Sequence, residues 1–182
     1  MTERKSIPDA LALIAGRGAY PLALADSARR QGVGRLFAVG FRGETDPALA
    51  QGVDELRWIR LGRLGELLET LQAAGIPDVV MAGQIRPRHL FRVRMDRRML
   101  QLLGRLRARN AETIFGALGE ELAGAGLVLR PAHWFMEAAM PAPGRLSARG
   151  PDEREQADIE LGCSVAKTVS GLDVGQTVVV KE

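Results

Sequence analysis

The sequence predicts an α/β fold: a Rossmann-like, mainly parallel sheet with helices on both faces, followed by a truncated second α/β domain. Two observations carry this prediction. Short, continuous apolar runs alternate with helical patterns along residues 10–129, and runs of this kind are typical of strands that are buried on both faces. Strands that alternate with helices form parallel sheets through right-handed crossovers.

Five strands and two intervening helices are expected in this first part. The apolar runs place the strands at residues 10–15, 36–39, 56–59, 79–82 and 127–129. The helices are expected at residues 21–31 and 64–74, ended by Gly32 and Gly75, because glycine tolerates the left-handed conformation that follows a helix. Pro21 suits a first helical turn, where its missing N–H group would have no partner.

Two further helices are predicted by their apolar periodicity. The first spans residues 94–106 and has arginines on one face and, on the other, Met95, Met99, Leu102, Leu103 and Leu106. Asn110 is a plausible N-cap for the second, whose inward face is expected to hold Ile114, Phe115, Leu118 and Leu122.

We expect residues 1–130 to form a nucleotide- or phosphate-binding domain and the Pro- and Gly-rich residues 131–150 to form a connector. Residues 151–182 then begin an incomplete C-terminal domain. Its helix should have Pro151 in its first turn and end at Gly171, and a strand should follow at residues 177–180. One helix and one strand bury too little surface to be stable alone, so the strand edge should pair either with another copy of the chain, in a homodimer, or with the missing C-terminal piece.

Two glycine-containing loops are the candidate ligand site. Gly16, Arg17, Gly18 and Ala19 follow the first strand, and Gly83, Gln84 and Arg86 follow the fourth. Ligands of open parallel sheets bind at the carboxyl ends of strands where the winding reverses, and a helix N-terminus there favours a phosphate. Three interpretations stay open: a tight turn without a ligand, a phosphate or nucleotide contact, and an NAD site.

The NAD interpretation lacks two of its usual supports. Pro21 stands where the dinucleotide fingerprint has its third small residue, and the second strand ends in Val39-Gly40-Phe41-Arg42 rather than in an acid. An NAD-linked oxidoreductase fragment is therefore the least favoured of the functions considered.

Residues 86–109 hold nine arginines and one acidic residue. This segment could be a solvated helix face, a site for anionic lipid headgroups or a nucleic-acid contact. The formal net charge is only +3 and aromatic residues make up 4% of the chain, so we expect no nucleic-acid partner. The single cysteine excludes an internal disulfide. We expect a cytoplasmic protein, at most peripheral at the inner membrane.

Three segments resemble the LpxI-type UDP-2,3-diacylglucosamine pyrophosphatases: LIAGRGAYPLALADSARRQG, VVMAGQIRP and PAPGRLSARGPDEREQADIELGCSVAKTVSGLDVGQTVVVKE. The resemblance implies a Rossmann-like domain, a hinge and a C-terminal domain of the family's own fold. It also implies Mg²⁺-dependent hydrolysis of UDP-diacylglucosamine to UMP and lipid X, a step of lipid A synthesis at the cytoplasmic membrane face. The implied partner is thus UDP-diacylglucosamine or a related nucleotide-sugar lipid.

The chain departs from the family pattern at several positions. The family continues past the V-V-V-K segment to an E-G-T-D-like run and an aspartate considered catalytic, so we expect the catalytic residues and the Mg²⁺ ligands to lie outside this chain. Arg17 replaces a glycine or asparagine, and the loop at Gln84 is one residue shorter. The resulting expectation is that the 182-residue chain binds the substrate weakly and does not hydrolyse it. The alternative is a noncatalytic nucleotide- or ligand-binding module.

Overall fold

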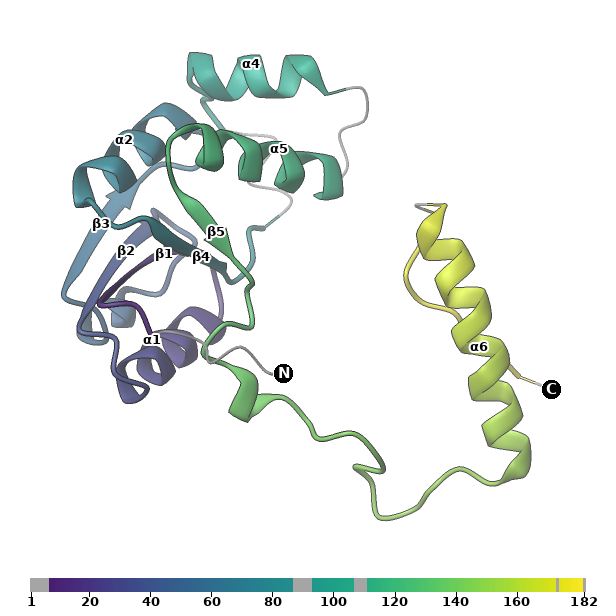
Figure 1. Cartoon of the computed structure of the whole chain (residues 1–182). Helices are drawn as coiled ribbons and strands as arrows, with labels where there is room; N and C mark the ends of the chain where they lie inside the picture. Colours follow the sequence, from purple (N-terminus) through teal and green to yellow (C-terminus); the bar gives the residue numbers. More distant parts are fainter. Residues whose placement is uncertain (1–6, 87–92, 107–110, 173, 182) are drawn as a thin grey trace. The chain divides into compact units, whose positions relative to one another are not determined.

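The computed structural model describes residues 7–86, 93–106, 111–172 and 174–181. The chain divides into two compact units, residues 1–139 and 140–182. Helices and strands carry the labels of Figure 1.

The first unit is built on a five-stranded parallel sheet. Its strands are β1 (Ala10–Ala15), β2 (Arg35–Phe41), β3 (Glu55–Ile59), β4 (Asp78–Ala82) and β5 (Val128–Arg130). They lie in the order β3-β2-β1-β4-β5, and each neighbouring pair is parallel. The predicted α/β fold is confirmed. The chain winds outward from β1 to β3 and then returns to the other side of β1, so the winding reverses between β1 and β4.

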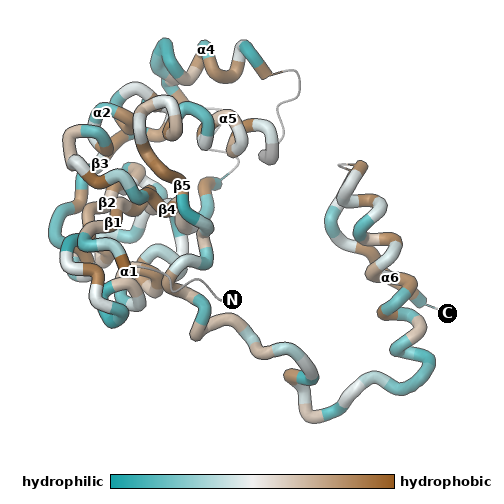
Figure 2. Tube along the Cα trace, viewed as in Figure 1, coloured by the Kyte–Doolittle hydropathy of each residue, from teal (hydrophilic) through white to brown (hydrophobic). Residues whose placement is uncertain are grey.

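Both faces of the sheet are covered by helices, which explains why the strands read as continuous apolar runs (Figure 2). Along β1, Ala12 and Ile14 belong to one core, whereas Leu11 and Leu13 belong to the other. Figure 1 shows α1 (Tyr20–Arg30) on one face, and α2 (Leu64–Ala74), α4 (Arg97–Arg105) and α5 (Ala111–Gly124) on the opposite face. The short helix η1 (Pro47–Gln51) packs on the α1 side through Leu49.

Local signals place the helix ends. Pro21 lies in the first turn of α1, and α2 ends at Gly75 with a left-handed φ of 67°, as predicted. The Asp96 carboxylate caps α4 by accepting the N–H of Met99 at 2.8 Å. The same carboxylate accepts the N–H of Gly65 at 2.7 Å, so one acid fixes the start of α4 against the start of α2.

The apolar face predicted for the basic helix is confirmed, because Leu102 is only 3% exposed and packs in the core. The inward orientation predicted for Phe115 is wrong, since its side chain is 54% exposed. Fully buried Leu122 shows that α5 reaches the core through its C-terminal half, and Phe115 lies in the other half. The predicted N-cap, Asn110, lies outside the described residues.

The segment after β5 belongs to the first unit, so the connector predicted from residue 131 begins later. Phe135 is fully buried in the α1-side core. Its carbonyl accepts hydrogen bonds from the Ser27 hydroxyl at 2.6 Å and the Gln31 side chain at 2.8 Å. These bonds and the burial of its ring hold Phe135 at a φ of 71°, a strained conformation for a bulky residue.

The second unit contains α6 (Glu153–Gly171), which begins with a capping box formed by Asp152 and Glu155. Pro151 precedes this cap, so its predicted place in the first turn is wrong. The strand predicted at residues 177–180 is also not formed. Instead, Val178 and Val180 lie beside Gly162 of α6, because their apolar side chains pack on the helix of the same unit. The predicted dimer edge is therefore not present as a strand.

No helix among the described residues has both the length and the hydropathy that spanning a membrane requires.

Candidate functional site

The loops after β1 and β4 meet at the carboxyl edge of the sheet, where the winding reverses. The N–H of Gly16 donates to the carbonyl of Ala82 at 2.7 Å. Arg17 and Gln84 then pair in an antiparallel bridge, with N–H to carbonyl distances of 2.7 Å and 3.0 Å. The structure thus brings the two predicted loops together at the place where ligands of open α/β sheets bind.

Two of the predicted glycines allow this close approach between the loops. A Cβ atom on Gly16 would lie 2.6 Å from the carbonyl oxygen of Gln84. A Cβ atom on Gly83, whose φ is +92°, would lie 2.8 Å from the carbonyl oxygen of Arg17. The N–H groups of Gly16, Arg17 and Gln84 already donate to backbone carbonyls. In the first loop, the remaining candidates for phosphate contacts are therefore the N–H groups of Gly18, Ala19 and the start of α1.

The start of α1 is suited to bind an anion. Ala19 is its N-cap, and its side chain caps none of the first-turn N–H groups. The helix dipole adds a partial positive charge at this end. Gly18 is exposed, has a φ of +100° and has nothing within 4 Å of the position a Cβ would take. A phosphate oxygen therefore has open access to this backbone.

The β4 loop brings Arg86 to the same edge of the sheet. Its Nε atom is buried and has no hydrogen-bond partner among the described residues. A buried guanidinium donor without an acceptor is costly, and a phosphate oxygen is an acceptor that a planar guanidinium binds well.

Sequence reasoning missed Glu44 and Thr45, which lie in the turn after β2 and are 6% and 5% exposed. The Thr45 hydroxyl donates to the Ala15 carbonyl at 2.5 Å and accepts the Phe41 N–H at 2.8 Å. One Glu44 carboxylate oxygen lies 3.4 Å from the Arg86 backbone nitrogen, which donates to it. The sequence signal for them is a pair of polar residues just beyond the second strand. The dinucleotide fingerprint, in contrast, has its acid at the end of the strand itself.

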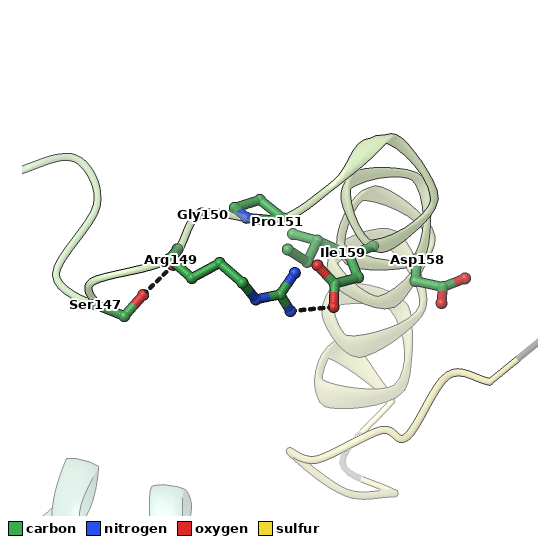
Figure 3. Close-up of a pocket in the computed structure, with 7 residues that line it drawn as sticks. Ser147, Arg149, Gly150, Pro151, Asp158 and Ile159 are labelled. Carbon is green, nitrogen blue, oxygen red and sulfur yellow. Dashed lines mark hydrogen bonds and ion pairs between the residues drawn. The ribbon is translucent and has the colours of Figure 1, made fainter.

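Two open pockets lie away from these loops. One, of about 650 Å³, is bordered by β2, β3 and α2 and lined by residues that include Arg42, Trp58 and Thr70. The other, of about 420 Å³, lies in the second unit beside α6 (Figure 3). There the Arg149 guanidinium, 2.5 Å from Glu155, and the Asp152 N–H lower the pKa of the Glu155 carboxyl. Neither pocket is lined by a predicted site residue.

Within the ranges that the structure describes, no three His, Cys, Asp or Glu side chains gather as a metal site would require. The donor set for Mg²⁺, which prefers carboxylate oxygens, is therefore not formed by these residues.

Comparison with known proteins gives the family of each unit. Residues 10–139 match the LpxI N-terminal domain, and residues 142–182 match the LpxI C-terminal domain. The chain is 31% identical over 178 residues to the UDP-2,3-diacylglucosamine pyrophosphatase LpxI of Caulobacter vibrioides. The alignment covers 94% of this chain and 61% of that relative, so the chain spans about three fifths of the relative's length.

Proposed function

Because the chain belongs to the LpxI family, we propose that it serves the hydrolysis of UDP-2,3-diacylglucosamine to UMP and lipid X in lipid A biosynthesis. The name of the Caulobacter relative supports this substrate and this reaction class. The first unit is proposed to bind the UDP part of the substrate.

The observation that carries this proposal is the junction of the β1 and β4 loops beside the uncapped start of α1. In the proposed complex, the N–H groups of Gly18 and Ala19 and the first turn of α1 bind pyrophosphate oxygens. The Arg86 guanidinium supplies a positive charge from the β4 loop. Gly16, Gly83 and Gln84 act by shaping the junction, and Arg17 shares this role through its backbone.

A noncatalytic nucleotide-binding module is the second candidate, and the site described above suits it equally. The distinguishing property is UMP release, which only a hydrolase would show. Mg²⁺ is proposed as the cofactor on the strength of the family resemblance. Because the described residues form no cluster that would hold the ion, no chemical step is assigned to it.

The basic face of α4 is proposed to attract anionic lipid headgroups, since the substrate carries acyl chains. Insertion of the helix's apolar face into a membrane is not part of the proposal, because Leu102 is packed in the protein core. Glu121 of α5 pairs with Arg98 at 2.7 Å and with Arg105 at 3.6 Å. Arg94, just before α4, and Arg97 are exposed. These two arginines would supply most of the electrostatic attraction to the lipid headgroups.

Isothermal calorimetry of the full chain with UDP and with NAD tests the nucleotide proposal. We expect UDP to bind and NAD to bind more weakly, because the first loop lacks the third small residue of NAD sites and the end of β2 lacks their acid. Tighter binding of NAD would contradict the assignment.

A further inference from the structure

The turn after β2 contains two neighbouring buried polar residues, Glu44 and Thr45. Burying a carboxylate and a hydroxyl is unfavourable unless each finds hydrogen-bond partners. Each of them contacts a different segment next to the candidate site. This arrangement calls for an explanation beyond the folding of the turn itself.

Thr45 connects the ends of two adjacent strands. Its hydroxyl bonds to the carbonyl of Ala15, the last residue of β1, and to the N–H of Phe41, the last residue of β2. Ala15 directly precedes Gly16, so this bond fixes the direction in which the first loop leaves the sheet.

Glu44 reaches the other loop. Its carboxylate accepts the Arg86 N–H at 3.4 Å, which is longer than a typical N–H···O hydrogen bond. Arg86 is two residues beyond Gln84, whose backbone is bonded to Arg17. The β4 loop is thus anchored at Gln84 to the first loop and at Arg86 to the turn after β2.

We infer that Glu44 and Thr45 are positioning residues for nucleotide binding: Thr45 sets the exit of the Gly16–Gly18 backbone, and Glu44 holds the β4 loop so that Arg86 faces the same site. This inference rests on the proposed function, because it assumes that Arg86 contacts the nucleotide phosphates.

The test is a double-mutant cycle on the full chain, with UDP binding measured by calorimetry. Glu44→Ala is expected to weaken UDP binding by about three- to tenfold, as loss of a charge-assisted hydrogen bond would. In the Arg86→Ala background, Glu44→Ala should have no further effect, because Glu44 acts through Arg86. Glu44→Gln retains an acceptor oxygen and should restore most of the affinity. Glu69→Ala, which removes an exposed acid from α2, should leave the affinity unchanged.

Amide hydrogen exchange without nucleotide gives an independent readout. Glu44→Ala should speed exchange at the Arg86 amide, and Thr45→Val should speed it at Phe41, whereas Thr45→Ser should not. Additive losses in the binding cycle, or an unchanged Arg86 amide in Glu44→Ala, would overturn the inference. If UDP fails to bind the wild-type chain, the proposed function fails, and the exchange rates alone decide whether Glu44 and Thr45 position the loops.

Discussion

Arg17 and Gln84 exchange two backbone hydrogen bonds across the point where the sheet reverses its winding. The β1 and β4 loops are therefore one connected structure rather than two independent walls of a crevice. A ligand at this edge must lie outside the bridge, toward Gly18 and the start of α1. The properties of the site should depend on whatever keeps this bridge intact.

Gly83→Ala should break the junction. Its Cβ would lie 2.8 Å from the Arg17 carbonyl oxygen and its φ is +92°, so we expect a loss of about 1–3 kcal/mol in the free energy of unfolding. Urea denaturation measures this loss. Gly104→Ala is the control, because a Cβ there meets nothing within 4 Å. A Gly83→Ala protein as stable as the wild type would contradict the described junction.

The stability of the first unit should depend on the ionisation of Asp54. The Leu36 N–H and then the Arg29 guanidinium, each 2.7 Å from its carboxylate, lower the pKa of Asp54 below the usual 3.8. A lowered pKa stabilises the fold above the unfolded-state pKa, and this stabilisation is lost as the pH falls through the folded-state value.

Comparison of wild type with Asp54→Asn tests this dependence. The wild type should be more stable at pH 7, and the difference should shrink as the pH is lowered below about 4. The effect should be small, because the Asp54 side chain is 49% exposed. Free energies of unfolding measured across this range give the answer, and a difference that grows toward acid pH would show that the sign is wrong.

Much of the first unit could be predicted from the sequence because its signals are local. The apolar run at residues 10–15 and the helix at residues 64–74 were placed with their observed bounds, since a strand covered on both faces and a glycine-ended helix leave clear patterns. Residues 177–180 have the same apolar character but form no strand. A strand requires a pairing partner, and no local pattern supplies one.

The site was only partly predictable for a related reason. The glycines were found because the loops follow apolar runs, but their role in joining the two loops depends on the distance between Gly16 and Gln84, which are far apart in sequence. Glu44 and Thr45 read as ordinary polar turn residues. Their burial follows from the packing of three strand ends and has no local signature.

Binding to anionic vesicles should depend on salt. We expect the full chain to co-sediment with phosphatidylglycerol vesicles at low ionic strength and to be released as salt shortens the screening length, which is about 10 Å at 0.1 M. Arg97→Ala should weaken the binding more than Arg30→Ala, which removes the same charge from α1. Equal sedimentation with neutral phosphatidylcholine vesicles would count against the lipid proposal.

Hydrolysis by the 182-residue chain is the next property to measure. Because the described residues gather no group of acids that would hold a metal, we expect no UMP release from UDP-diacylglucosamine with Mg²⁺ present. The Caulobacter relative serves as the positive control. Robust UMP release by this chain alone would mean that an acid such as Asp158 of α6 takes part in the chemistry.

Whether the backbone at Gly18 binds the nucleotide phosphates can be tested with a matched pair of variants. Gly18 and Gly32 flank the two ends of α1 with φ values of +100° and +103°, and neither would place a Cβ within 4 Å of another atom. Gly18→Ala and Gly32→Ala should therefore lose similar stability, about 1–3 kcal/mol each.

The deciding measurement is the calorimetric affinity of both variants for UDP. We predict that Gly18→Ala weakens UDP binding at least about tenfold, the factor that corresponds to 1.4 kcal/mol, whereas Gly32→Ala binds UDP like the wild type. Equal UDP affinity in Gly18→Ala and wild type would contradict the proposed phosphate site.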